Sequence, residues 1–577
     1  MRRVLSLALA LALPASSTQT TSGISKAVEV SVTNLDVVVT DSNGKAIPDL
    51  TAADFEVKQD GVVQPLTNFS FIRNAPAAPE TASAPGPEPS PAPAPGLPAY
   101  EPPQAARAHL IVFVDELHLT AGNKNRALRS LRQYLPTVVG PNVEVQFVTW
   151  DRALRIRGPF TSDVAILSSL MDSLEHETSI GGVTKSEHDQ IVREIDSALM
   201  AGTTAGPVLL QNAILNLRSW CDQQAAMVDT TVEALHASFA AVSGVEGRKV
   251  LFLVTEKFTP SPGRDIWDYI QYGTQRAGSV TSISSSRRGG GTADVNDLTW
   301  TTWDRGPAFR SLTPRANAAG ISIVTIDAAG LTTDEMVSAE SGASIGRMDE
   351  GIAQVDMQMA MGLLAGETGG KTIVGRNDLA LALKDLEADW TAYYSLGYES
   401  PSAKPGVPRA IKVSVKRPGA KVRSRRAVIE RTPEEKVSDA VLTGVHIPHK
   451  VNPLGASLHV GIPKKSGKMW LVPLEFKIPF DKITLVPQGG RAKGAVLFTA
   501  VSATLDGRIS PVTTERAPID VPEKELAGLA GKSFTYSATL KVRAGPQIFS
   551  TGLTDEVSRL TSYVQPHVLI GDKPGER

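Results

Sequence analysis

Residues 109–114, with the sequence HLIVFV, decide the fold of this chain. The run is essentially apolar and ends at Asp115. Such a run is typical of a strand that is buried on both faces of a parallel sheet, because a strand with one solvated face alternates apolar and polar residues. Residues 250–254 and 321–326 repeat the pattern, and residues 143–148 form a further expected strand. We therefore expect a buried parallel sheet at the centre of the chain.

Helical periodicity separates these strands. Leu128, Leu131, Leu135 and Val138 recur at steps of three and four residues, as on the buried face of an amphipathic helix. The other expected helices cover residues 164–174, 190–199, 208–220, 231–242, 355–365 and 378–389. Strands at 371–374 and 392–396 close the series. Alternating strands and helices predict right-handed βαβ units, and hence an α/β fold with a doubly wound, mostly parallel sheet.

The chain divides into six expected segments. With 577 residues it is too long for a single hydrophobic core. The α/β domain covers 108–400, with a helical insertion at 176–230 and a loop at 274–300 rich in Ser, Arg and Gly. The remaining segments are a signal peptide at 1–20, a small β module at 27–74, a Pro/Ala-rich linker at 75–107, a basic β segment at 401–436 and a C-terminal β-sandwich-like domain at 437–577.

The first twenty residues predict export. Arg2 and Arg3 precede an apolar run at 5–13, and small residues with a proline follow it. This order is typical of a secretory signal peptide, and the run is too short to span a bilayer. We expect a secreted or periplasmic protein without a transmembrane segment. Cys221 is the only cysteine, so no intramolecular disulfide can form, and we expect its thiol to be buried.

The charge balance gives no general attraction to nucleic acid. Lys and Arg together number 59 and Asp and Glu 60, for a formal net charge of -1. Nine basic residues do cluster between 404 and 426, where 412–416 alternates as in a strand. An anionic lipid, polysaccharide or nucleic acid would suit this run, but it has no aromatic residue for base stacking. We favour a solvated strand face, which commonly protects a sheet edge. The basic residues are Lys404, Arg409, Lys412, Lys416, Arg417, Lys421, Arg423, Arg425 and Arg426.

Several stretches together carry a family pattern. They are 38–45 (VVTDSNGK) with 50–57 (LTAADFEV), 318–328 (AAGISIVTIDA), 365–371 (AGETGGK) and 393–398 (YYSLGY). In this order they resemble the von Willebrand factor A-related proteins of acidobacterial type, over roughly residues 28–430. The resemblance implies an exported A-domain protein. A domains in general bind proteins, often through a divalent cation at the top of the sheet.

The resemblance also places a metal site, which this chain matches only in part. The family pattern Asp-x-Ser-x-Ser corresponds to residues 115–119, where Asp115 is present but Leu117 and Leu119 replace the two serines. Glu256 stands where an Asp is expected after the fourth strand. Asp115, Glu116 and Glu256 are thus the candidate metal ligands, for weak binding of Mg²⁺ or of the more tolerant Ca²⁺. We favour loss of the metal, because leucine offers no oxygen ligand, and we assign no other cofactor.

The functional hypothesis is a protein-binding role without catalysis, in adhesion or as a scaffold. The loops at 115–120, 149–152 and 256–264 would face the partner. The candidate partner-binding residues are Asp115, His118, Thr120, Asp151 and Glu256. Two alternatives remain, a metal-dependent hydrolase that uses the same acids and a structural envelope component. The sequence identifies neither the partner nor the oligomeric state.

Three motifs that suggest chemistry have simpler explanations. Residues 365–372 fit a relaxed P-loop, but a helix precedes and a strand follows, the reverse of a phosphate loop. Residues 342–346 fit Gly-x-Ser-x-Gly without the strand that a nucleophile elbow requires. His446 and His449 have no neighbouring Cys or carboxylate at zinc spacing. We assign no nucleotide, nucleophile or zinc to these positions.

Overall fold

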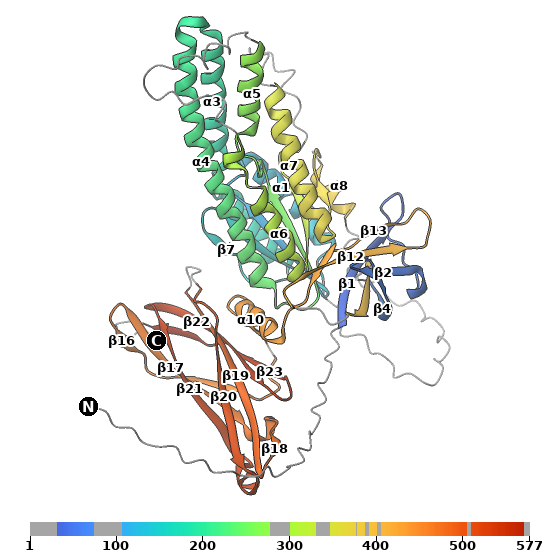
Figure 1. Ribbon diagram of the computed structural model, residues 1–577, viewed down its shortest axis with the longest axis vertical. Helices are drawn as coiled ribbons and strands as arrows, with labels where there is room; N and C mark the ends of the chain where they lie inside the picture. Colours follow the sequence, from blue (N-terminus) through green and yellow to red (C-terminus); the bar gives the residue numbers. More distant parts are fainter. Residues whose placement is uncertain are drawn as a thin grey trace, which may run out of the picture.

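The computed structural model describes residues 32–73, 107–276, 300–330, 347–376, 378–386, 392–400, 405–449, 451–504 and 509–570. The chain has mixed α/β content, with one sheet of parallel and antiparallel strands and several antiparallel sheets (Figure 1). The expected signal peptide at 1–20, most of the linker at 75–107, most of the loop at 274–300 and the motif at 342–346 lie outside the described residues. No helix in the described part is long and apolar enough to cross a membrane.

The central sheet has six strands in the order β10-β9-β8-β5-β6-β7. Neighbouring strands are parallel except for β7, which runs antiparallel to β6 at the edge. Every residue of β5 and β8 is buried, as their apolar sequences require. The strands are β5 (Ala108–Asp115), β6 (Val143–Trp150), β7 (Leu154–Ile156), β8 (Arg248–Thr255), β9 (Ile321–Asp327) and β10 (Thr372–Ile373).

Helices cover both faces of this sheet. Leu110, Val112 and Val114 of β5 pack with α1 (Ala121–Tyr134), α2 (Val164–His176) and α8 (Leu379–Lys384). Ile111 and Phe113 point the opposite way, into a second core. That core includes side chains of α4 (Gly202–Val242), α6 (Gly306–Ala318) and α7 (Arg347–Thr368). The alternation of side chains along each strand thus divides one apolar run between two cores.

The insertion forms a helical extension beyond the sheet. It contains α3 (Gly181–Met200) and the first half of α4. Two further elements, α5 (Arg264–Arg276) and the short η5 (Trp300–Trp303), pack against these helices. Figure 1 shows α3, α4 and α5 rising from one end of the sheet. The helices expected at 208–220 and 231–242 are one 41-residue helix. Residues 221–230 contain neither glycine nor proline, so nothing in them stops the helix.

The N-terminal β module is completed by strands from beyond the α/β domain. Its two sheets have the orders β13-β1-β11-β4 and β14-β12-β2-β3. The strand expected to close the parallel series, at 392–396, is instead β11 (Ala392–Glu399), which pairs antiparallel with β1 and β4. The reason is that its Tyr394, Leu396 and Tyr398 fill the core of this module. The other strands are β1 (Val32–Thr40), β2 (Phe55–Gln59), β3 (Val62–Gln64), β4 (Leu66–Arg73), β12 (Pro408–Val415), β13 (Lys421–Arg423) and β14 (Ala427–Ile429).

The chain leaves this module for the α/β domain and returns to it at neighbouring positions. Arg73, the last residue of β4, is the register partner of Ala392, the first residue of β11. The basic segment expected at 401–436 supplies β12, β13 and β14 to the same module. The α/β domain is therefore inserted into the β module.

In its described residues, the C-terminal region consists mainly of two antiparallel sheets and one α-helix. The helix α10 (Pro433–Thr443) reaches the end of α4, where the Gly244 N–H donates to Thr443 Oγ1 at 3.0 Å. Apolar side chains of both sheets share one core. One sheet holds β15 (Ser457–Val460), β16 (Lys464–Ser466), β17 (Met469–Pro479) and β21 (Ser533–Val542). The other holds β18 (Val486–Gln488), β19 (Arg491–Thr504), β20 (Thr513–Pro522), β22 (Gly545–Asp555), β23 (Thr561–Val564) and β24 (His567–Ile570).

Candidate functional site

The carboxyl ends of β5, β8 and β9 bring polar side chains to one edge of the central sheet. Asp115 ends β5, Thr255 and Glu256 lie at the end of β8, and Asp327 ends β9. Thr255 and Asp327 are register partners on neighbouring parallel strands. Open α/β sheets bind ligands at this edge. Asp115 and Glu256 therefore lie on the edge where the sequence places them.

Asp115 is fully buried and is held by two neighbours. Its Oδ2 accepts a hydrogen bond from Thr255 Oγ1 at 2.7 Å and another from His118 Nδ1 at 2.8 Å. The His118 ring packs against Phe258, with 5.2 Å between ring centroids. Both donors come from the protein itself, so the Asp115 carboxylate is already satisfied.

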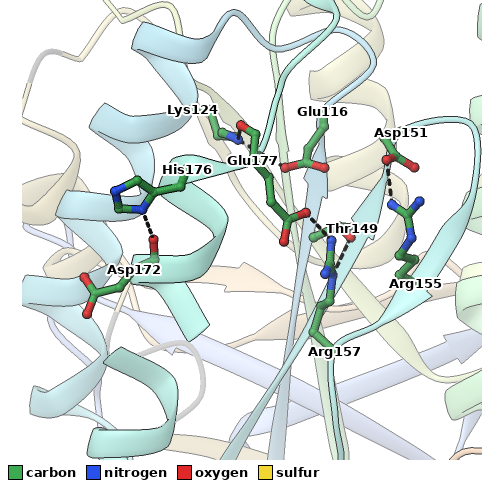
Figure 2. A network of polar contacts seen from close by, with 9 residues as sticks. All are labelled: Glu116, Lys124, Thr149, Asp151, Arg155, Arg157, Asp172, His176 and Glu177. Atoms are coloured by element: carbon green, nitrogen blue, oxygen red, sulfur yellow. Dashed lines mark hydrogen bonds and ion pairs between the residues drawn. The ribbon is translucent and has the colours of Figure 1, made fainter. Parts of the chain in front are cut away.

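Glu116 takes part in a different network, shown in Figure 2. Its Oε1 accepts from Lys124 Nζ of α1 at 3.2 Å, and the side chains of Glu116 and Lys124 are 1% and 0% exposed. Lys124 Nζ also donates to the Glu177 carbonyl at 2.5 Å. Arg157 bridges the Glu177 carboxylate and Thr149 Oγ1. Burial raises the pKa of Glu116, and Lys124 opposes that effect.

Glu256 and Asp151 also have partners within the protein. Glu256 Oε2 accepts from the Thr120 N–H at 3.1 Å and from Thr120 Oγ1 at 3.0 Å. Asp151 pairs with Arg155 and accepts from the Ala153 N–H, close to the network of Figure 2. Each acidic side chain expected at this edge is thus fixed by a separate set of donors.

These residues do not fit a divalent cation. Asp115, Glu116 and Glu256 are each bound by different partners, and Leu117 and Leu119, buried beside them, offer no oxygen ligand. Within the described ranges no three His, Cys, Asp or Glu side chains gather as metal ligands would. The donor set of this edge therefore gives no basis for a metal-dependent step.

Asp327 is the residue of this edge that the sequence reasoning missed. Its Oδ1 accepts from the Ala329 N–H at 3.0 Å, and its Oδ2 is buried with no hydrogen-bond partner among the described residues. Burial, with the nearby Glu256 charge, raises the pKa of Asp327 to about 6. The signal was present, because Asp327 directly follows a buried apolar run just as Asp115 does.

The start of the helical extension covers the loop after β5. The Ile180 N–H donates to the Glu116 carbonyl at 2.9 Å, and the Gly181 N–H donates to the Leu119 carbonyl at 3.1 Å. Asp115, His118 and Glu256 are therefore buried, and only Thr120 and Asp151 of the candidate partner-binding residues are partly exposed. The three buried residues cannot touch a macromolecular partner in this conformation, contrary to the expectation that this loop faces one.

Exposed apolar side chains occur at several other places, and one group of them lies on the α3–α4 hairpin. Met200, Val208 and Leu215 are 70%, 62% and 54% exposed. A groove of about 390 Å³ runs between the two helices, with Leu209 beside polar side chains that include Glu194 and Asn216. Exposed apolar side chains and a groove on the same pair of helices make this hairpin the candidate surface for a protein partner.

A largely buried histidine, His188, joins this hairpin to α5. His188 Nε2 lies 2.8 Å from Asp265 Oδ2, and its Nδ1 lies 3.3 Å from Asp189 Oδ1. Burial opposes a charge on the ring, but the hydrogen bonds to Asp189 and Asp265 outweigh it and raise the pKa of His188 to about 9. The protonated ring therefore stabilises the contact between α3 and α5.

We expect His188→Gln to lower the free energy of unfolding by about 2 kcal/mol near pH 6, after allowance for residual solvent. The folded pKa of His188 lies above the value of about 6.5 in unfolded chains, so its contribution is complete below that value. The contribution is lost as the pH rises through about 9. Urea unfolding of the native protein and of His188→Gln from pH 6 to 10 measures whether their free energies of unfolding converge at high pH. His176→Gln, at an exposed ring, is the control, and equal pH profiles for the two variants would contradict the assignment (Figure 2).

The basic run is largely used inside the protein. Arg417 forms a bidentate pair with Asp49, Arg409 pairs with Asp60, and Arg426 pairs with Glu367. The Arg425 side chain is half-buried and donates to the carbonyls of Asn317 and Asn34. Lys404 lies outside the described residues. These pairs join β12–β14 to the N-terminal strands and to α6, so the run is not a free cationic patch.

The remaining motifs have structural roles. Gly370 follows α7, and a Cβ there would lie 1.9 Å from the Ile323 carbonyl oxygen, so the glycine allows close packing on β9. Burial raises the pKa of the Cys221 thiol to about 12, which makes it unreactive. His449 Nε2 lies 2.7 Å from the Ala440 carbonyl within α10.

Comparison with known proteins gives weak similarity only. The chain matches no protein-family model, and no curated protein matches it. Among solved structures it is similar to an aerotolerance-related membrane protein from Bacteroides fragilis, at 10% identity over 49% of this chain and 98% of that chain, with TM-score 0.21. The vWF domain of the type V pili tip protein Mfa5 from Porphyromonas gingivalis has 13% identity over 49% of this chain and 95% of that chain, with TM-score 0.21. A structure of three N-terminal domains of the same pili tip protein has 9% identity over 88% of this chain and 79% of that chain, with TM-score 0.24. Values this low carry no argument about function.

Proposed function

We propose that this chain is an exported, non-enzymatic protein-binding component, an adhesion or scaffold protein. Its α/β domain is of the von Willebrand factor A-like kind, with a degenerate metal site. The observation that carries the proposal is the contrast between two surfaces. The acids of the carboxyl edge are buried and paired, whereas the α3–α4 hairpin above them exposes Met200, Val208 and Leu215. Export rests on the pattern of residues 1–20 alone.

The loss of metal-dependent recognition follows from the side chains at the edge. A domains often bind partners through a cation at this place. Here Thr255 and His118 donate to Asp115, Thr120 donates to Glu256, and Lys124 donates to Glu116. A cation would have to displace a donor that already binds each of these carboxylates, and it would gain no oxygen from Leu117 or Leu119. Recognition is therefore assigned to the helical surface and not to an ion.

The geometry does not favour the hydrolase alternative, because each acid is bound by a partner of its own. The alternative of a structural envelope component without a specific ligand makes a different prediction for the hairpin. It predicts that the exposed apolar side chains contact no particular protein. A cross-linking experiment distinguishes the two.

We expect a photo-cross-linking amino acid at Val208 to give discrete protein adducts in the cells that produce this chain. Val208 is 62% exposed on the hairpin. The matched control is Val486, which is 49% exposed on β18 of the C-terminal region. Adducts are expected from Val208 only, and their yield is expected to be unchanged by EDTA. Equal adducts from both positions, or none from either, would favour a structural component.

Calorimetric titration of Mg²⁺ and Ca²⁺ into the chelator-stripped protein tests the metal directly. We expect no saturable heat up to millimolar cation. Saturable binding that disappears in Asp115→Ala, together with EDTA-sensitive adducts, would contradict the degenerate site.

A further inference from the structure

Among the described strands of the C-terminal region, β21 has one edge without a partner strand. β21 pairs with β17 over ten residues without a register shift, from Ser533 opposite Pro479 to Val542 opposite Trp470. No other strand in the described ranges pairs with β21. Its second edge therefore presents backbone N–H and C=O groups that a further strand can bind.

The neighbouring edge shows how this protein protects a strand. β20 likewise has a single partner, β19, but it contains Pro518 and Pro522, which have no N–H to donate. It also carries the exposed charges Glu515, Arg516 and Asp520. β21 contains no proline and a single charge, Lys541. Of these two edges, only β21 lacks the features that prevent pairing.

The two faces of β21 differ in a way that sets the register of an added strand. Phe534, Tyr536, Ala538 and Leu540 are partly buried against the core, and Ser533, Thr535, Ser537, Thr539 and Lys541 are exposed. A partner strand must continue both faces. A slip of one residue would turn its apolar side chains to water.

We propose that two copies of this chain associate through β21, antiparallel and centred on Ser537. In this register Ser537 faces its own copy, Thr535 faces Thr539, and Ser533 faces Lys541 on the exposed side. On the core side Phe534 faces Leu540 and Tyr536 faces Ala538. Every pair is therefore of like polarity, and no two like charges are opposed. The strand is complementary to itself, as a two-fold interface requires.

Because β21 is complementary to itself, a second copy of this chain is the partner that we assign to its unpaired edge. A strand of another protein would need to bring a matching pattern, whereas β21 already contains it. The inference is independent of the proposed role of the α3–α4 hairpin, because it concerns a different part of the chain.

Disulfide trapping of the full mature chain tests the register. Opposed residues in an antiparallel pair have Cα atoms about 4.5–5.5 Å apart, within the range of about 4.4–6.8 Å that a disulfide spans. Ser537→Cys should therefore form a covalent dimer under mild oxidation. Thr535→Cys is the control, since its own copy would lie about 13 Å away. The native Cys221 is buried and should not react.

A mixture of the Thr535→Cys and Thr539→Cys chains should cross-link, because these positions face each other in the proposed dimer. Sedimentation of the uncross-linked protein gives an independent measure. Ser537→Lys opposes two like charges at an exposed position and should weaken the dimer by up to about fivefold. Mixing it with Ser537→Glu should restore association. A native chain that is monomeric up to millimolar concentration would overturn the proposal. So would equal cross-linking of Ser537→Cys and Thr535→Cys, or self-association unaffected by Ser537→Lys.

Discussion

Replacing Lys124 with methionine is expected to destabilise the protein by about 3–5 kcal/mol. The Lys124 ammonium is fully buried and donates to Glu116 Oε1 and to the Glu177 carbonyl. Its removal leaves the Glu116 carboxylate inside the protein without its counter-charge, while the other carboxylate oxygen already has no hydrogen-bond partner among the described residues. Guanidinium unfolding followed by tryptophan fluorescence measures the loss.

The same helix supplies a matched control. Arg132 of α1 pairs with Asp172 and Glu175, with about a third of its side chain exposed (32%), and Arg132→Met should cost less than about 1 kcal/mol. The double variant Lys124→Met/Glu116→Leu should recover most of the stability, because it removes both charges.

The deficit of Lys124→Met should also shrink as the pH falls. Burial raises the pKa of Glu116 in the folded protein above its unfolded value. A protonated Glu116 no longer needs a counter-charge, so acid relieves the folded variant more than the unfolded chain. If Lys124→Met lost no more stability than Arg132→Met, or if its loss grew in acid, the result would contradict a buried ion pair between Lys124 and Glu116.

Gly181→Ala is expected to cost about 3 kcal/mol and to loosen the helical extension from the sheet. A Cβ at this position would lie 2.2 Å from the His118 carbonyl oxygen and 2.6 Å from the Leu119 carbonyl carbon. Both atoms belong to the backbone, so no side chain can move aside. The loop at 116–119 and the start of α3 would have to separate, which breaks the hydrogen bond from Gly181 to Leu119.

The adjacent glycine separates steric conflict from a general effect of alanine. A Cβ on Gly182 would meet nothing within 4 Å, so Gly182→Ala should be neutral or stabilising by up to about 1 kcal/mol. Hydrogen exchange reports the local change, since the amides of Ile180 and Gly181 should lose protection in Gly181→Ala and keep it in Gly182→Ala. Similar exchange in the two variants would mean that the extension is not fastened at this point.

Apolar runs made the central sheet predictable, and with it the edge that carries Asp115 and Glu256. The direction of each side chain was not predictable. Glu116 follows Asp115 in sequence yet meets Lys124 from α1, because successive side chains leave the chain in different directions. Only the packed structure shows that Thr120 donates a hydrogen bond to the Glu256 carboxylate. The same holds for Ile180 and Gly181, which cover the loop that follows β5. The burial of His118 follows from those long-range contacts and from no local pattern.

Strand partners were the second limit. The stretch at 393–398 shows a strand, but its own sequence does not say which sheet it joins. Tyr394 decides the matter through a contact 347 residues away, where its hydroxyl donates to the Ile47 carbonyl. The C-terminal strands β17 and β21, in contrast, show the alternating burial of a strand with one covered face. A single strand with alternating burial can be recognised from its own sequence. A β module whose strands lie before and after an inserted domain cannot, because the sequence does not say which strands pair.

The adjacency of Arg73 and Ala392 has a mechanical consequence. If the chain is pulled at its two ends, tension follows the shortest covalent and hydrogen-bonded path. Here that path crosses the β module, where β1 and β4 flank β11, and passes on to α10 and the C-terminal sheets. The α/β domain hangs from the path as a side branch, since its entry and exit are neighbours. Under a pull on the chain ends, the central sheet and the α3–α4 hairpin would stay unloaded until the β module opens, so stretching the chain would not distort the surface of the hairpin.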